Sequence, residues 1–253
     1  MLETLKYIMI GLMIGLLTVN TQIVASASSV EEIQMIDEIS QATGLSNQEI
    51  ENDIELVQEL LDLTREEAIE KLYEEVVLQY LEDVDNLEIS GRSSSSSGTK
   101  KYLPTTSGSG AIRGNIFYTP SKTSGWNHGH AGLYASASTI VHAPGRGSEV
   151  RTDRAGKLEA DSGSKIAQPN STSKRGSAAT YAEKRIGAPY LTSTVNMSCP
   201  KAANYKTDKV NCSQLVYCAY KHAGVDVSNG STIFVSPKDV VNNKNVTTVW
   251  SRK

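Results

Sequence analysis

Apolar residues recur at helical spacing in the N-terminal third of the chain. Two sets of them lie three or four positions apart: Ile50, Ile54, Val57 and Leu61, then Ile69, Leu72, Val76 and Tyr80. Residues at this spacing line one face of a helix. The pattern predicts a small all-α region in which short helices share a modest core.

Helix starts can also be placed in this region. A hydroxyl residue is followed three positions later by a glutamate at Ser29…Glu32, Ser46…Glu49 and Thr64…Glu67. This is the capping box, in which the two side chains satisfy free amides of the first helical turn. Gly44 is a suitable residue to end the first helix. We therefore expect three helices within residues 28–90.

The C-terminal part mixes strand-like and helical patterns, which indicates an α+β fold. Residues 125–134 and 139–145 read as two short strands joined by a turn of small residues. A turn centred on Ser136 would place His130 directly opposite His142, with Cβ atoms about 5 Å apart. A helix is expected to begin after Asn211, a good N-cap, and to end at Gly224.

The charge is divided unevenly along the chain. Residues 30–88 hold 19 acidic residues against Arg65 and Lys71, a net charge of −17, whereas residues 100–253 carry a net charge of +13. The acidic region could dock on the basic domain as a pro-region or cap, or it could be a solvated spacer. A Ser/Gly-rich linker is expected over residues 91–109, and the basic domain over residues 110–253.

The N-terminus resembles an export signal. Lys6 precedes an apolar stretch over residues 7–19, and Ala25 to Ala27 offers a small-residue cleavage site. A membrane anchor is the alternative, but Asn20 interrupts the run well short of the ~20 residues that a span needs. We therefore expect a signal peptide over residues 1–27 and a protein that is secreted or associated with the cell wall.

Export and charge together restrict the expected partners. Basic residues of the C-terminal domain are scattered and are not interleaved with aromatic residues, so a nucleic-acid partner is not expected. Anionic cell-wall polymers fit the charge and the location better. The three cysteines leave one thiol unpaired under any pairing, and a Cys199–Cys218 disulfide would leave Cys212 free.

The free cysteine occupies a position suited to catalysis. Cys212 would lie in the first turn of the predicted helix, where free amides and the helix dipole are expected to lower its pKa. The same amides could stabilise an oxyanion. A thiolate beside a histidine is the pair used in nucleophilic catalysis, although most isolated cysteines are core residues.

These segments together resemble a known family. Residues 186–190 (IGAPY) and 211–216 (NCSQLV), with the histidine strands, are similar to the NlpC-type papain-like cysteine peptidases. Because both histidines precede the cysteine, the order resembles the circularly permuted YiiX/YebB-like branch. The resemblance covers residues 110–250, and Asn211 and Asn115 stand where the family usually has aspartate.

The resemblance implies a fold and a set of roles. The fold is a permuted papain-like domain with an antiparallel sheet packed on the cysteine-bearing helix. Cys212 would be the nucleophile, His130 the base, His142 the orienting group and Tyr190 a donor to the oxyanion. The implied reaction is hydrolysis of an amide, with a cell-wall peptide as substrate and with neither cofactor nor metal.

Three other interpretations stay open from the sequence. His128, His130 and His142 could bind a zinc ion, which would leave the cysteine segment without a role. The domain could retain the frame of an enzyme but only bind the cell wall. An amidase or esterase acting on acyl-lipid substrates is the third possibility.

Overall fold

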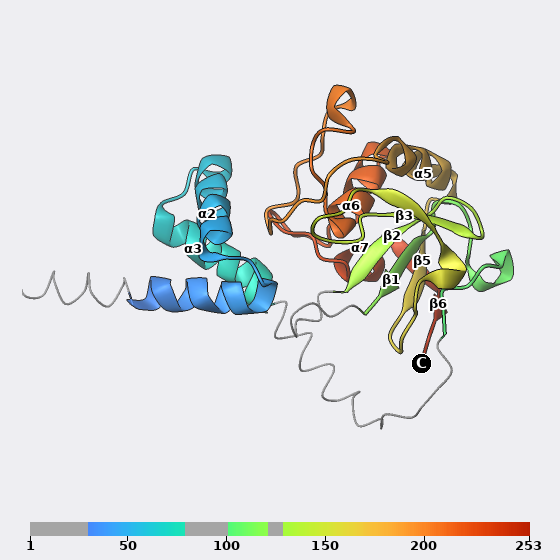
Figure 1. The fold of residues 1–253 in the computed structure, drawn as a ribbon, viewed down its shortest axis with the longest axis horizontal. Coiled ribbons are helices and arrows are strands. Elements are labelled where there is room, and N and C mark those ends of the chain that lie inside the picture. Colours follow the sequence, from blue (N-terminus) through green and yellow to red (C-terminus); the bar gives the residue numbers. More distant parts are fainter. Residues whose placement is uncertain (1–29, 79–100, 121–128) are drawn as a thin grey trace, which may run out of the picture.

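The computed structural model describes residues 30–78, 101–120 and 129–253, which form a helical unit and an α+β unit (Figure 1). The predicted signal peptide and most of the predicted linker lie outside these ranges. Among the described residues, no helix is both long and apolar enough to cross a membrane.

The helical unit has the predicted helices. A helix over residues 30–43 is followed by α2 (Asn47–Leu61), α3 (Arg65–Tyr73) and a π-helical turn, η1 (Glu74–Leu78). The capping boxes at Ser46 and Thr64 are confirmed, and Gly44 ends the first helix with a φ of 68°. The first predicted capping residue, Ser29, lies outside the described residues. The shared core is confirmed for the described residues, although Leu61 is 39% exposed and the predicted core residue Tyr80 lies outside them.

The α+β unit is built on one antiparallel sheet. Its six strands lie in the order β4-β3-β2-β1-β5-β6. Their bounds are β1 Ile116–Thr119, β2 His130–Tyr134, β3 Thr139–His142, β4 Arg151–Arg154, β5 Lys165–Pro169 and β6 Val246–Ser251. The predicted α+β class is confirmed at this level.

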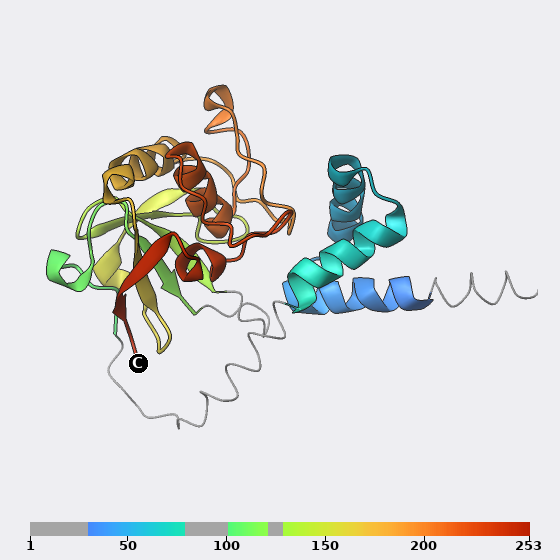
Figure 2. The same cartoon turned by 180° about the vertical axis from the view of Figure 1, so that it is seen from behind.

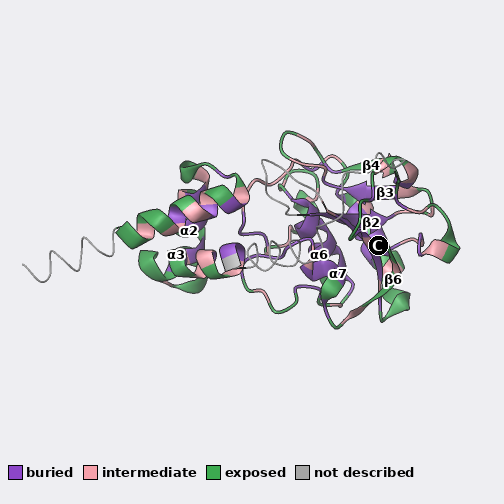
Figure 3. Ribbon diagram, turned by 90° about the horizontal axis from the view of Figure 1, so that it is seen from below, coloured by how far each residue is buried: buried purple, intermediate pink, exposed green. Residues whose placement is uncertain are grey.

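Helices cover one face of this sheet. They are α5 (Arg175–Lys184), α6 (Cys212–His222) and the short α7 (Asp239–Asn242), seen from both sides in Figures 1 and 2. One apolar core lies between α5, α6, α7 and the sheet, and a second core lies on the other face around Phe117 and Tyr134. The buried positions follow this layering, with α6 and α7 buried next to the sheet (Figure 3). The expected packing of the cysteine-bearing helix on the sheet is thus present.

The α+β unit begins earlier than predicted. Residues 101–109 were expected in the linker, but Leu103 is buried and its amide donates to the carbonyl of Leu158 at 3.0 Å. Tyr102 forms a bridge with Glu159, and a 3-10 turn, η2, covers Ser107–Ser109. The predicted boundary at residue 110 is therefore too late, because this segment pairs with a distant part of the chain. Three further 3-10 turns connect the strands and helices, η3 Ala155–Lys157, η4 Thr172–Lys174 and η5 Ala202–Asn204.

Candidate active site

Cys212 is the first residue of α6. The side chain of Asn211 accepts a hydrogen bond from the amide of Gln214 at 2.9 Å, and the Gln214 side chain accepts one from the amide of Asn211 at 3.3 Å. This reciprocal cap confirms Asn211 as the N-cap, and the helix ends beside Gly224 as predicted. Cys212 therefore occupies the first turn, where helix amides have no carbonyl partner within the helix.

The register of the histidine strands differs from the prediction. Leu133 pairs with Val141 and Tyr134 with Ile140, so the turn is centred on Ala137 rather than Ser136. Continued to the strand ends, this register places His142 beside Gly132 and not opposite His130. The direct opposition is wrong, but a shift of two positions keeps both side chains on one face. Diagonal neighbours are still within reach of long side chains.

The two imidazoles are in fact hydrogen-bonded. Nε2 of His130 lies 2.7 Å from Nδ1 of His142, and both rings are buried. Phe117, which pairs with Gly132 across β1 and β2, packs against both rings at centroid distances of 5.6 and 6.3 Å. A Cβ at Gly132 would lie 2.6 Å from the Phe117 ring. The missing side chain at Gly132 thus lets the phenyl ring lie against the histidine pair.

Asp153 extends this pair and was missed in the sequence. Its Oδ2 lies 2.9 Å from Nε2 of His142 and 3.0 Å from Nε of Arg151. Burial raises the pKa of Asp153, but the hydrogen bonds from His142 and Arg151 outweigh it and hold this pKa below its ordinary value. The feature that could have identified Asp153 as a site residue is its position on β4, where it pairs with Ile140 of β3. Finding it required the β3–β4 register, which no local motif specifies.

The carboxylate of Asp153 determines the protonation of the chain of groups. A carboxylate only accepts hydrogen bonds, so Nε2 of His142 carries the proton that faces it. Burial lowers the pKa of His142, which keeps its ring neutral and leaves Nδ1 as an acceptor. Nε2 of His130 must then donate to that Nδ1. In the neutral form of His130 the proton is then on Nε2, so Nδ1 is the nitrogen that can accept a proton.

Tyr190 reaches the site despite the 22 positions that separate it from Cys212. A parallel bridge joins Tyr190 to Val210, two residues before Cys212, and the Tyr190 amide donates to the carbonyl of Ser148 at 3.0 Å. Burial raises the pKa of the Tyr190 hydroxyl, and the neighbouring Cys212 raises it further. Tyr190 therefore stays protonated at neutral pH and can act as a hydrogen-bond donor.

Three of the four predicted residues line one cavity, and the fourth contacts it through His130. Cys212, His130 and Tyr190 line a cavity of about 200 Å³, and His142 lies behind His130. Burial raises the pKa of Cys212, while the backbone amides of Ala131 and Ser213 oppose that effect. The expected net lowering by the helix terminus is therefore wrong, because the thiol is 5% exposed and desolvation outweighs the amides. A thiolate there needs a cation beside it.

The remaining cysteines and histidines have other positions. Cys199 and Cys218 form a disulfide, so the predicted pairing is confirmed and Cys212 is the free thiol. His128, the third ligand of the zinc interpretation, lies outside the described residues. Both ring nitrogens of His142 are already hydrogen-bonded, to His130 and Asp153. The geometry around His142 thus suits a hydrogen-bonded relay better than metal ligation.

A relative found among known proteins is similar to nearly the whole chain. No family model matches the chain. The chain is 29% identical over 241 residues to the uncharacterized protein YycO of Bacillus subtilis (strain 168), with 94% of this chain and 92% of that protein covered. Because so little of the chain is left uncovered, the likeness extends across the helical unit as well as the α+β unit. The two units are thus similar to parts of one protein of nearly the same length.

Proposed function

We propose that this protein is a thiol hydrolase of circularly permuted papain-like type, with Cys212 as nucleophile. The observation that carries the proposal is a chain of hydrogen bonds that runs from Asp153 through His142 to His130. His130, at its end, lines the same cavity as Cys212. A cysteine that only packs in the core does not require a buried relay of hydrogen-bonded imidazoles. In catalysis such a relay fixes the tautomer of the base and stabilises its cationic form.

The proposed reaction begins with proton transfer from the Cys212 thiol to Nδ1 of His130. The sulfur then attacks the carbonyl carbon of an amide, and the oxygen takes the negative charge. Amides at the start of α6 and the Tyr190 hydroxyl are placed to donate to that oxyanion. His130 returns the proton to the departing amine as the carbon–nitrogen bond breaks, which leaves a thioester on Cys212.

Water completes the cycle. His130 removes a proton from the water molecule, the resulting hydroxide attacks the thioester, and the acid product leaves with the thiol restored. His142 does not exchange a proton with substrate in this scheme. It accepts from His130 while Asp153 accepts from its other nitrogen, so Asp153 acts as a positioning residue.

The proposed substrate is a cell-wall peptide met outside the cytoplasm. The support is the sequence resemblance, the export-like leader and the basic charge of residues 100–253. Acyl-lipid amides or esters and a non-catalytic wall-binding role are competing outcomes, since the same nucleophile accepts any carbonyl that fits the cavity. Release of amine groups from purified wall fragments, with and without acyl-lipid competitors, separates these outcomes.

The chemistry is tested through the reactivity of the thiol. Iodoacetamide should label wild-type Cys212 rapidly well below pH 9.0, the ordinary pKa of a thiol, because protonated His130 stabilises the thiolate. In His130→Ala the labelling should need a pH above that value, since burial then acts alone. Asp153→Asn, which keeps the shape of the side chain, should fall between the two. Equal pH profiles for wild type and His130→Ala would refute the proposed function.

A further inference from the structure

The helical unit forms part of the cavity that contains Cys212. Thr43, Gly44 and Leu45, the turn between the first helix and α2, line the cavity together with Cys212 and His130. The cavity that this turn lines keeps a space of about 200 Å³ beside the thiol. A segment that blocked the site would fill this space, whereas this turn bounds it.

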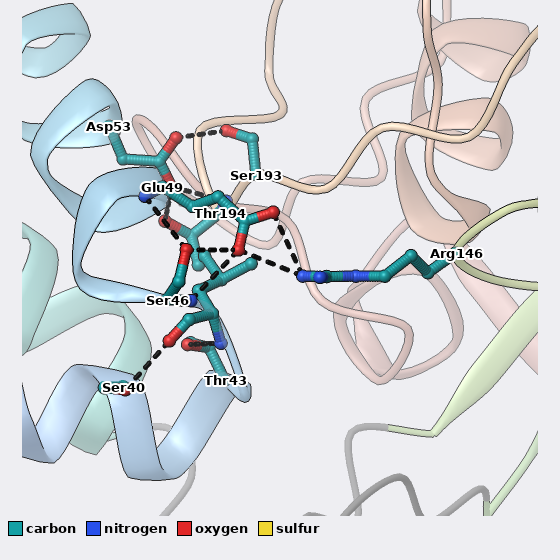
Figure 4. A network of polar contacts seen from close by, with 9 residues as sticks. Ser40, Thr43, Ser46, Glu49, Asp53, Arg146, Ser193 and Thr194 are labelled. Carbon is teal, nitrogen blue, oxygen red and sulfur yellow. Dashed lines mark hydrogen bonds and ion pairs between the residues drawn. The ribbon is translucent and has the colours of Figure 1, made fainter.

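The turn has a fixed shape. Gly44 has a φ of 68°, which few residues with a side chain adopt. The Thr43 hydroxyl donates to the carbonyl of Ile39 at 2.7 Å and accepts from the amide of Leu45 at 3.2 Å. The Ser40 hydroxyl donates to the carbonyl of Leu45 at 2.8 Å (Figure 4). The wall of the cavity is therefore held by its own hydrogen bonds.

Two carboxylates anchor the helical unit on the α+β unit. Asp53 is 4% exposed and accepts from the Ser193 hydroxyl at 2.6 Å, the Thr194 amide at 2.8 Å and the Thr194 hydroxyl at 2.7 Å (Figure 4). Glu75, on η1, accepts from the hydroxyl of Thr232 and from the amides of residues 232–234. The donors to Asp53 and Glu75 from the α+β unit are neutral groups, so these two contacts consist of oriented hydrogen bonds.

Apolar contacts join the two units into one core. Val195, Ile233 and Phe234 of the α+β unit belong to the same buried cluster as the residues of the three helices. Without the helical unit these side chains and the backbone amides that bind Glu75 would be exposed to water. An ion pair between Arg146 and Glu49 also joins the two units, with the arginine side chain 60% exposed (Figure 4).

The anchored loops also support the nucleophile. Asn196 donates to the carbonyl of Val235 and accepts from the amide of Val235, at 2.9 and 2.7 Å, so it ties the two loops together. The same side chain lies 3.4 Å from the Oδ1 of Asn211, the cap of the cysteine-bearing helix. The loops that hold the helical unit thus continue directly into the site.

We infer that the helical unit is a permanent wall of the substrate cleft, and that Thr43, Gly44 and Leu45 limit the size of the acyl group beside Cys212. The inference rests on the proposed function, because it takes the Cys212 sulfur as the reacting atom. The cavity is smaller than the roughly 300–1,000 Å³ of most ligand sites. The lining from this unit is a hydroxyl, a glycine and a leucine, so it selects for small, uncharged groups.

The inference is tested by the size selectivity of alkylation. Iodoacetamide and N-benzyl-iodoacetamide share one reactive group, and Cys212 is the free thiol on which their rates are compared. Leu45→Ala widens the cavity and should raise the rate with the benzyl reagent, relative to iodoacetamide, by about fivefold. The matched control is Leu72→Ala, the same truncation at a buried position of the same core that does not line the cavity. It should leave the ratio unchanged.

A second variant covers the case in which Leu45→Ala does not fold. Gly44→Asn retains the positive φ, which asparagine tolerates, and adds a side chain where a Cβ meets no atom within 4 Å. It should lower the relative rate of the benzyl reagent. An unchanged ratio in the folded variants, or an equal change in Leu72→Ala, would overturn the inference. Failure of the proposed function would be seen in a different measurement. The pH profile of labelling would then no longer depend on His130, while the ratio of the two alkylation rates could still be measured.

Discussion

Asp53 is the side chain on which the seating of the helical unit depends most directly, so its truncation has a predictable cost. Asp53→Ala removes the acceptor for the Thr194 amide, the Thr194 hydroxyl and the Ser193 hydroxyl. The hydroxyls can rotate, and Ser193 already has the carbonyl of Val195 at 3.3 Å. The amide of Thr194 cannot turn away, and leaving it buried without a partner costs about 1–3 kcal/mol.

Burying the carboxylate of Asp53 is itself unfavourable, and this limits the loss of stability expected when Asp53 is replaced. Burial raises the pKa of Asp53, because desolvation of the carboxylate outweighs the hydrogen bonds from Ser193 and Thr194 that favour its charged form. Because Asp53→Ala also removes this desolvation cost, we expect it to lower the free energy of unfolding by about 2 kcal/mol, the middle of the range for a buried amide that loses its acceptor. Asp53→Asn keeps one acceptor oxygen for the Thr194 amide and should cost about 1 kcal/mol.

Urea unfolding with two signals measures this. Circular dichroism at 222 nm follows mainly the helices, whereas tryptophan fluorescence reports on the α+β unit through Trp250, which packs against an apolar core of that unit. In 1 M NaCl, where the screening length is about 3 Å, the wild-type curve should hardly move. Equal losses in Asp53→Asn and Asp53→Ala, together with a similar loss in salt, would refute the reasoning and show that charge holds the unit.

The disulfide and the buried His142 each allow a further prediction about stability. Replacing Cys199 and Cys218 by alanine should lower the free energy of unfolding by about 3 kcal/mol, because the disulfide closes a loop across 19 positions; an equal stability of the variant and wild type would contradict this. Burial lowers the pKa of His142 below 6.5, so the unfolded chain binds more protons there in the window below 6.5 and stability should rise with pH through that window. His142→Gln should reduce that rise in urea titrations between pH 5 and 7.5, and an unchanged slope would contradict the assigned neutral ring.

Local signals explain what the sequence could predict. The start of α6 depends on Asn211 and Gln214, which lie three positions apart, and the end of the first helix depends on Gly44. Both features are encoded within one helical turn, and their prediction required no knowledge of the rest of the fold. The same holds for the capping boxes of α2 and α3.

Register and long-range pairing explain what could not be predicted. The turn between β2 and β3 is Ala-Ser-Ala-Ser, which contains no glycine or asparagine to specify its centre. Its observed closure, from the Ala135 amide to the Thr139 carbonyl at 2.8 Å, moved the pairing by two positions. Asp153 depends on a further register, across β3 and β4. Asp53 is one of many acidic residues in its region, and nothing near it in the sequence marks it as the buried one.

The opposite charges of the two regions explain less than their contacts do. A difference of this size attracts over the Debye length and favours encounter, but it does not select one orientation. The orientation is set where Asp53 and Glu75 meet amides and hydroxyls that fit them and where apolar side chains close around Phe234. Asn196, in one of those loops, donates a hydrogen bond to Asn211, the cap of the Cys212 helix. The position of the helical unit and the geometry of the nucleophile are therefore coupled. A variant that loosens the seat should therefore change the site even when its own position is far from the sulfur.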